Sequence, residues 1–173
     1  MKKKIDVFEH MGEILNGVKN GVLITSKADD RVNSMTISWG TVGVEWGKPI
    51  FVTFIRENRF TRNLLEKNGE FTVNIPIDDS AKKILGFCGS KSGRDIDKAK
   101  EIGLTYEDPE IISVPGVKEL PLTLECKVIY KQTQDIHAIT EENQEKFYPQ
   151  SADGSQDIHV AYYGEIVNAY VIE

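Results

Sequence analysis

The residues best suited to hold a charged ligand follow a short apolar run, Ile50–Ile55. They are three arginines, one asparagine and one threonine: Arg56, Asn58, Arg59, Thr61 and Arg62. Helical spacing begins in the same stretch, so these side chains are expected around the N-terminus of a helix. A helix N-terminus offers free amides and a positive dipole end, and arginine adds charge-assisted hydrogen bonds. This cluster therefore predicts a phosphate site.

A second segment, Asn33–Gly40, alternates small polar side chains with apolar ones. It reads Asn-Ser-Met-Thr-Ile-Ser-Trp-Gly. Hydroxyl groups and backbone amides suit the edge of a flat polar ring, and the apolar side chains suit its face. Together with the phosphate site, this segment predicts a phosphorylated aromatic cofactor, for which flavin mononucleotide (FMN) is the candidate.

Composition places the chain among ordinary globular proteins. It has 173 residues, of which 40% are hydrophobic and 28% charged, and its net charge is −6. This length is typical of a single domain, here residues 1–173. The negative charge disfavours nucleic-acid and anionic-membrane partners. No apolar run approaches transmembrane length and no apolar segment follows the basic start, Met1–Lys4, so a cytoplasmic location is expected.

Cysteine and histidine residues are too scattered to predict a metal site. Cys88 and Cys126 lie in no metal-ligand spacing, which favours two reduced structural thiols. His10, His137 and His159 are equally far apart. His159 suits a structural role in a strand at least as well as a contact with cofactor or substrate.

Hydrophobic periodicity predicts six strands and four helices. The strands cover residues 21–25, 32–39, 49–55, 70–75, 122–131 and 159–172, the last bent near Gly164 or Asn168. The helices cover residues 5–15, 60–67 and 96–102, together with a segment that Ser80 caps and that runs to Gly89. Between them, a turn-rich connection is expected through Trp46, Gly47, Lys48 and Pro49. Residues 90–95 are interpreted as a polar loop and 140–157 as a loop or flap.

The predicted fold class is mainly β with peripheral helices. The opening strands follow one another without an intervening helix, which argues against a doubly wound parallel sheet. Six strands with helices inserted between them favour a closed antiparallel barrel.

Six blocks of the chain, in their order and spacing, resemble the flavin reductase-like family, which includes the flavoredoxins. The blocks are Asn33–Gly40, Gly47–Pro49, Arg56–Thr61, Glu70–Asn74, Gly89–Asp95 and His159–Val167. No single block is specific, but the ordered set covers the chain from about Gly21 to its C-terminus. The resemblance implies the family's fold, a six-stranded antiparallel FMN-binding split barrel with Greek-key connections.

The resemblance assigns the flavin ring to the first block. The implied ring contacts are Asn33, Ser34, Met35, Thr36, Ser38 and Trp39. Backbone groups of this strand would pair with the pyrimidine edge of the flavin. Ile37 is expected in the core, whereas Trp39 suits the core and the cofactor site equally. Asn33 also suits the turn that follows Arg31.

The second block resembles the family's phosphate-binding turn. The implied phosphate ligands are Arg56, Arg59 and Thr61. Arg62 is expected to point to solvent. The alternative interpretation is an exposed basic helix start whose arginines pair with Glu57 and Glu66.

The loop after Gly89 resembles the family segment that lies beside the flavin. The implied contacts are Ser90, Lys91 and Ser92, and a lysine there would stabilise the reduced flavin anion. The loop is not a phosphate-binding P-loop, because it has no Gly-Lys-Thr or Gly-Lys-Ser triplet. Helix capping by Ser92 or Asp95 is the alternative, and it is compatible with cofactor contact.

The activity that the resemblance implies is that of an FMN-dependent NAD(P)H oxidoreductase or flavin reductase. No catalytic residue is assigned, because the flavin itself carries the redox chemistry. NAD(P)H or a redox partner protein would supply electrons, and a homodimer would place FMN near its interface. The alternative is a non-enzymatic FMN-bearing electron carrier that acts only with a partner. A third and weaker hypothesis is a related barrel that holds haem or pyridoxal phosphate.

Overall fold

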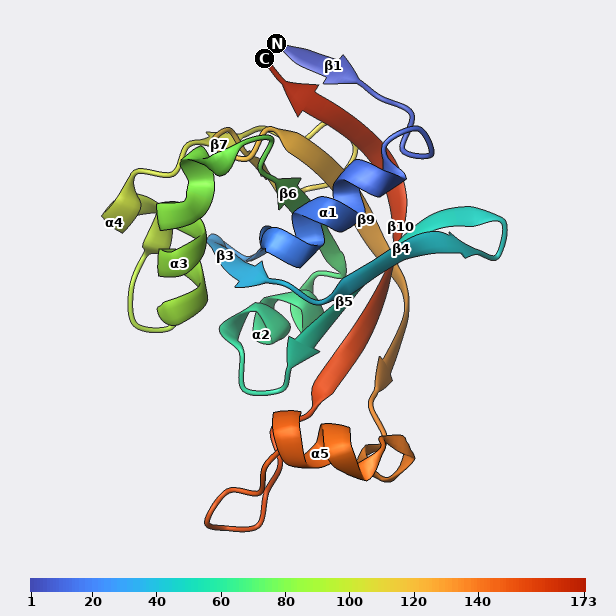
Figure 1. The fold of residues 1–173 in the computed structure, drawn as a ribbon. Coiled ribbons are helices and arrows are strands. Elements are labelled where there is room, and N and C mark those ends of the chain that lie inside the picture. Colours follow the sequence, from blue (N-terminus) through green and yellow to red (C-terminus); the bar gives the residue numbers. More distant parts are fainter.

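The computed structural model describes residues 1–173 and is built around one antiparallel sheet (Figure 1). Its strands are hydrogen-bonded in the order β3-β2-β6-β9-β10-β5-β4, and β1 pairs with β10. They are β1 (Lys2–Lys4), β2 (Val22–Ala28), β3 (Arg31–Ile37), β4 (Gly40–Glu45), β5 (Lys48–Arg56), β6 (Glu70–Ile75), β9 (Leu122–Thr133) and β10 (His159–Ile172). A separate pair consists of β7 (Tyr106–Glu107) and β8 (Gly116–Val117).

The sheet coils into a barrel that is split between β3 and β4. These two strands end the hydrogen-bonded order and do not pair with each other. The main core lies inside and includes Phe51, Phe71 and Tyr162. Helix α1 (Met11–Asn20) contacts β4 and β6 and closes part of the split, with Ile14 and Val18 in the same core (Figure 1). The mainly β split-barrel prediction is confirmed, and β1, β4 and the β7–β8 pair are additions to the six expected strands.

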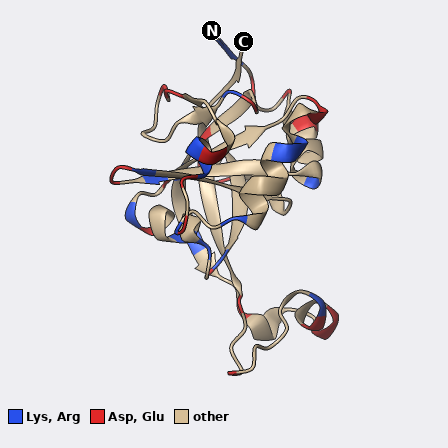
Figure 2. Ribbon diagram, turned by 90° about the vertical axis from the view of Figure 1, so that its left-hand side faces the viewer, with Lys and Arg blue, Asp and Glu red and all other residues tan.

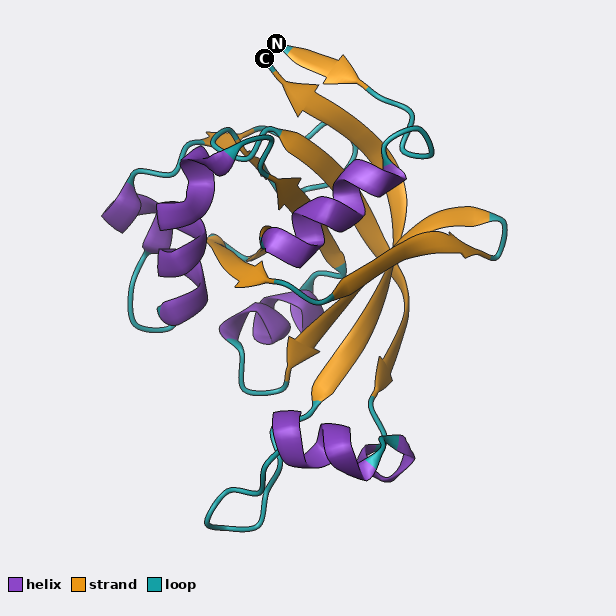
Figure 3. Cartoon of the chain, viewed as in Figure 1, coloured by secondary structure: helices purple, strands orange, loops and turns teal.

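Helices α2 (Phe60–Lys67), α3 (Lys82–Ser90) and α4 (Lys98–Ile102) cover the β2–β3 side of the barrel (Figure 3). β2 is therefore buried on both faces, and it begins with three consecutive apolar residues, Val22, Leu23 and Ile24. Val22 and Ile24 enter the main core, whereas Leu23 joins Cys88 and Leu120 in a smaller core beneath the helices. This packing fixes the helices against β3.

The turn predicted around Trp46 and Gly47 is a tight hairpin turn, but the prediction missed β4, which precedes it. Glu45 pairs with Lys48, and the two residues between them, Trp46 and Gly47, have φ angles of 51° and 69°. Positive φ at both central positions is the geometry of a two-residue hairpin that follows the twist of its strands. The predicted strand 32–39 consequently ends at Ile37, and Trp39 lies at the corner before β4.

The opening helix lies further along the chain than the predicted segment 5–15. Of the residues whose spacing suggested it, Phe8 precedes the helix and is exposed, and Leu15 is also exposed. Ile14 and Val18 form the buried face instead. The helix 5–15 was thus predicted too early in the chain, because apolar residues also precede the helix.

Two other helix starts differ from the predictions. Ser80 does not cap α3: it lies in a 3₁₀ turn, η1 (Asp79–Ala81), where the Asp78 carboxylate accepts a hydrogen bond from its amide. Helix α4 starts at Lys98 rather than residue 96, because the carboxylate of Asp97 caps it. No helix in the chain has the length and apolar character needed to cross a membrane.

Residues 134–158 form an arm that projects from one end of the barrel (Figures 1 and 3). The arm contains η2 (Ile136–Ala138) and α5 (Glu141–Phe147), so the loop prediction for residues 140–157 missed a helix. It is strongly acidic, with one lysine, Lys146, against six carboxylates (Figure 2). These are Asp135, Glu141, Glu142, Glu145, Asp153 and Asp157.

Candidate cofactor-binding groove

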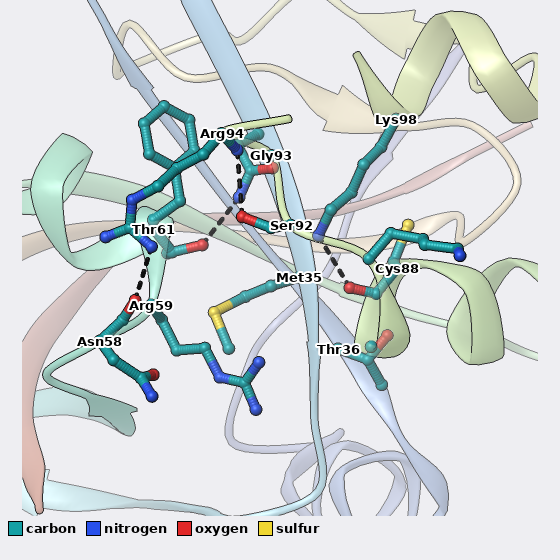
Figure 4. A pocket seen from close by; sticks show the side chains of 14 residues that line it. Met35, Thr36, Asn58, Arg59, Thr61, Cys88, Ser92, Gly93, Arg94 and Lys98 are labelled. Atoms are coloured by element: carbon teal, nitrogen blue, oxygen red, sulfur yellow. Dashed lines mark hydrogen bonds between the residues drawn. The ribbon is translucent and has the colours of Figure 1, made fainter. Parts of the chain in front are cut away.

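Two adjoining cavities run along β3. The first, of about 320 Å³, lies between β3, the start of α2 and the α3–α4 loop (Figure 4). The second, of about 160 Å³, lies at the Trp39 end of the strand. Met35, Thr36 and Arg59 line both cavities, so the two form one groove. Its size is in the range of small-molecule sites, which is roughly 300–1,000 Å³.

The first cavity is cationic. Its lining includes Arg59, Lys91, Arg94 and Lys98 but no carboxylate. Arg59 precedes α2 as its N-cap residue, and no side chain caps the free amides of the first turn. No acidic residue lies in that turn either. These amides and cations make this end of the groove an anion site.

A buried hydrogen bond organises the floor of this anion site. The Asn33 side-chain amide donates to Thr61 Oγ1 over 2.9 Å. The Thr61 hydroxyl therefore accepts from the protein and keeps its own proton for a ligand. Gly93 lies directly against this pair, since a Cβ at residue 93 would stand 2.1 Å from Asn33 Oδ1. The α3–α4 loop can approach β3 this closely only with glycine there.

Two arginines hold the α3–α4 loop beside α2. Arg31 donates to the Gly93 carbonyl over 2.6 Å, and Arg94 donates to the Asn58 carbonyl over 2.7 Å. Both guanidinium groups face the ring of Phe60, at 5.2 and 5.8 Å from its centroid. The loop and the helix start therefore form one side of the site, with Arg59 beside Met35 in the middle (Figure 4).

The Trp39 end of the groove is aromatic. Trp39 is 40% exposed and meets Phe147 of the arm edge to face, with ring centroids 4.9 Å apart. Arg56 lies in this second cavity, where it donates to the carbonyls of Asp157 and Phe147 over 2.5 and 2.9 Å. Its guanidinium therefore ties the arm to the barrel and does not line the first cavity.

His159 is buried beside Trp39 as a neutral imidazole. Burial, reinforced by the charges of Arg56 and Arg59, lowers the pKa of His159 to about 4. The Tyr148 hydroxyl donates to Gln134 Oε1 and lies 2.8 Å from His159 Nδ1. Because the single tyrosine proton is already used, Nδ1 donates to Tyr148, and Nε2 is left as an acceptor.

Most of the predicted site residues line the groove. The structure brings together Asn33, Met35, Thr36, Ser38, Trp39, Arg56, Arg59, Thr61, Lys91 and Ser92. The Ser34 side chain does not line either cavity, because its hydroxyl is buried and shares a hydrogen bond with Thr25. Ser90 does not line them either, since it ends α3 and donates to the Phe87 carbonyl.

Sequence reasoning missed Gly93, Arg94 and Lys98 as lining residues. Gly93 and Arg94 fall within the block Gly89–Asp95, so that resemblance could have included them. Lys98 carried no local signal, because it stands among alternating charged residues at the start of a short helix.

The fold and the groove define an antiparallel split barrel with an anion site and an aromatic site joined along one edge strand. The chain belongs to the flavin reductase-like family: the family model described as flavin reductase like domain matches residues 15–173. The predicted resemblance is thus confirmed.

The matches with sequence relatives extend over only part of each relative's length. A protein of Archaeoglobus fulgidus is 27% identical over 64% of this chain and 61% of its own length. The protein YddH of Escherichia coli K12 is 32% identical over 69% of this chain and 64% of its own length. The matches therefore span somewhat more than three fifths of these relatives, both named as uncharacterized.

Solved structures share the fold. Flavoredoxin from Methanosarcina acetivorans has a TM-score of 0.66 at 24% identity, covering 88% of this chain and 68% of its own. Flavoredoxin of Desulfovibrio vulgaris has a TM-score of 0.68 at 23% identity, covering 88% and 69%. An FMN-binding domain of a flavin reductase-like enzyme from Shewanella baltica has a TM-score of 0.69 at 17% identity, covering 99% and 77%.

Proposed function

We propose that this chain binds FMN in the groove along β3 and is an FMN-dependent oxidoreductase. The observation that carries the proposal is the joining of an anion site to an aromatic site along one strand, in a member of the flavin reductase-like family. FMN has a phosphate at one end and a flat ring system at the other. Two similar structures are flavoredoxins and a third is an FMN-binding domain, which supports the choice of flavin.

The residues present fit this cofactor. The free amides of α2, Arg59 and the Thr61 hydroxyl would hold the phosphate, and Arg94 adds charge beside them. The ring would lie along Met35, Thr36 and Ser38 toward Trp39. When bound, FMN supplies hydride and electron transfer.

The chain's own residues orient ligands and limit the entry of water. Arg56 fixes the arm, and the arm places Phe147 against Trp39 at the open end of the groove. His159 is neutral and presents an acceptor nitrogen, so it suits a hydrogen-bond donor on the cofactor or substrate. These residues position a reaction but do not supply a nucleophile.

NAD(P)H or a redox partner protein is the proposed electron donor, and the acceptor is a second small molecule or protein. An electron carrier that acts only with a partner is the second candidate. The acidic arm favours it, because α5 ends at Phe147 beside the groove and its carboxylates, Glu141, Glu142 and Glu145, are exposed. A basic redox protein could dock on this face close to the flavin.

A homodimer is also part of the proposal. Trp46 is 57% exposed and meets Tyr130, which in turn meets Tyr163. This row of aromatic side chains on the outer face of β9, β10 and the β4–β5 turn is an unusual surface for a monomer. Association of two copies would bury it.

Spectroscopy of the purified protein tests the cofactor. The protein should show the absorbance bands of bound flavin as purified or after FMN is added. Failure to take up FMN under native conditions would refute the proposal. NAD(P)H oxidation without any added protein separates the enzyme from the carrier: turnover identifies an enzyme, and turnover only with a redox partner identifies a carrier.

A further inference from the structure

A third cavity adjoins the groove at Trp39. Its volume is about 600 Å³, and it lies between α1, the corner from β3 to β4, β5 and the start of the arm. Ser38, Trp39 and Phe54 line both this cavity and the second cavity of the groove. None of its lining residues lines the first, cationic cavity. We call it the α1 cavity, because α1 forms one of its sides.

The α1 cavity offers apolar and aromatic surface to a ligand. Leu15 of α1 is 45% exposed, Trp39 is 40% exposed, and Phe54 is half-buried. A single exposed apolar side chain is ordinary, but here three of them surround one hollow. Two of the three carry flat aromatic rings, which favour a planar ligand.

A buried chain of hydrogen bonds orients Gln134 at the edge of this cavity. His159 Nδ1 donates to the Tyr148 hydroxyl over 2.8 Å, and that hydroxyl donates to Gln134 Oε1 over 2.9 Å. Tyr148 and His159 are each only 5% exposed. The amide oxygen of Gln134 is thus used inside the protein, which leaves its two N–H groups as donors for the cavity that Gln134 lines.

Lys19 is the only charged residue that lines the α1 cavity. No ion pair includes it, and no carboxylate lines the cavity. The Ser38 hydroxyl adds a further polar group. The polar groups of the cavity are therefore a cation, an amide with free N–H groups and a hydroxyl, set around an apolar surface. Such a set complements a ligand that has an apolar body and one anionic group.

We propose that the α1 cavity is a second ligand site, which binds a small planar carboxylate beside the flavin groove. The ring of the ligand would lie against Trp39 and Phe54. Its carboxylate would accept hydrogen bonds from Lys19 and from the amide of Gln134. The inference goes beyond the proposed function, because this ligand is not the cofactor and its site is present without the flavin. The competing explanation is a surface hollow that holds only water.

The test compares trans-cinnamate, a planar aromatic carboxylate, with cinnamamide, a neutral molecule of the same shape. Isothermal titration calorimetry at neutral pH gives their dissociation constants for the flavin-free protein and for protein loaded with FMN. Cinnamate should bind about tenfold more tightly than cinnamamide, the effect of one charged hydrogen bond. The two forms of the protein should bind cinnamate equally.

Two variants separate the charge from the amide. Lys19→Met should abolish the preference for cinnamate and leave cinnamamide binding unchanged. Gln134→Leu should weaken both ligands by about 2- to 10-fold, because each has an oxygen that accepts from the amide. Lys83→Met, at an exposed lysine of α3, is the matched control for the charge. Gln132→Leu is the control for the amide, since Gln132 also accepts from a tyrosine hydroxyl but does not line the cavity. Both controls should behave as wild type.

Absence of cinnamate binding, or equal affinity for cinnamate and cinnamamide, would overturn the inference. Displacement of cinnamate by FMN would overturn it as well, because the cavity would then belong to the flavin groove. Lys19 is exposed, so its substitution should not impair folding, and an unchanged preference in Lys19→Met would also contradict the site. A protein that takes up no FMN but binds cinnamate would refute the proposed function alone.

Discussion

Arg56 and Arg59 are three positions apart but have different roles in this groove: Arg56 binds the arm, and Arg59 lines the anion site. Arg56 is the last residue of β5, and its guanidinium is held by two backbone carbonyls of the arm. Arg59 is the N-cap residue of α2, and no hydrogen bond or ion pair to the protein holds its side chain. Arg56, at the end of β5, points toward the arm. Arg59, at the start of α2, lies in the anion site.

Substitution of each arginine should therefore give a different defect. Arg56→Ala should loosen the arm, because two charged hydrogen bonds worth about 1.5–3 kcal/mol each are lost. Limited trypsin digestion should then cut faster at Lys146, the only lysine of the arm. FMN and riboflavin affinities should change by the same factor.

Arg59→Ala is the reciprocal control. It should leave digestion at Lys146 unchanged but weaken FMN binding about tenfold more than riboflavin binding, because the lost charge faces the phosphate. An arm that stays equally protected in Arg56→Ala would contradict the assignment of Arg56 to the arm.

His159 should make the stability of the protein depend on pH. Its pKa in the folded protein is about 4, below the 6.5 of an ordinary histidine. The unfolded chain therefore binds more protons between these values, so stability is lost as the pH falls from about 6.5 toward 4. At 1.36 kcal/mol per pH unit, the loss near pH 4 is about 3 kcal/mol.

Urea unfolding at several pH values measures this loss. Carboxylates titrate in the same range, so the informative quantity is the difference between variants. His159→Gln should flatten the profile between pH 4 and 6.5. His137→Gln, at an exposed position, should keep the wild-type slope. Parallel profiles for all three proteins would show that His159 does not have the lowered pKa.

At the scale of elements, the site depends on how closely the α3–α4 loop approaches β3. Gly93 is the point of closest approach, held by Arg31 on one side and packed against Asn33 on the other. Phe60 of α2 would also lie 2.9 Å from a Cβ there. The loop, the strand and the helix are thus fitted together at one glycine.

Gly93→Ala should push the loop away from β3 and weaken FMN binding. Overpacking of this kind typically costs about 1–3 kcal/mol of stability. The variant should show a lower melting temperature and a larger FMN dissociation constant. Gly86→Ala, in α3, has nothing within 4 Å of the added Cβ and should be neutral or slightly stabilising. Unchanged FMN affinity in Gly93→Ala would show that the loop position does not matter for the cofactor.

At the scale of the whole molecule, charge and apolar surface are separated. The arm carries six carboxylates and one lysine, cations line the groove, and the aromatic row of Trp46, Tyr130 and Tyr163 occupies the outer face of the sheet. The groove suits a small anion, whereas the aromatic row suits another protein surface. A second copy of the chain is the proposed occupant of that row.

Sedimentation velocity should show a dimer at micromolar concentration. Tyr130→Glu places a charge in the aromatic row and should shift the protein toward monomer by at least tenfold in dissociation constant. Ile111→Glu, at an exposed apolar residue outside the row, is the control and should remain dimeric. A wild-type monomer that still binds FMN would contradict the dimer proposal, and a dimeric Tyr130→Glu variant would place the interface elsewhere.

The sequence by itself determined the fold class, the family and most of the groove. The long strand β9 is recognisable in the sequence because its apolar residues alternate, and Leu122, Leu124 and Cys126 on one face enter the core. The arginine and threonine residues around α2 and the hydroxyl residues of β3 were visible as types suited to a ligand. These patterns are local, so they can be recognised without knowing which other segments pack against them.

Only the tertiary structure decided which side chains meet. β4 escaped detection because two of its six residues are glycine and its turn is Trp-Gly rather than a common turn pair. The hydrogen bonds of Arg56 to the arm and of Lys98 to Ser34 each depend on segments far away in the chain. The type of a side chain limits what it can bind. Its actual partners depend on how distant elements pack together, and a local sequence pattern does not contain that information.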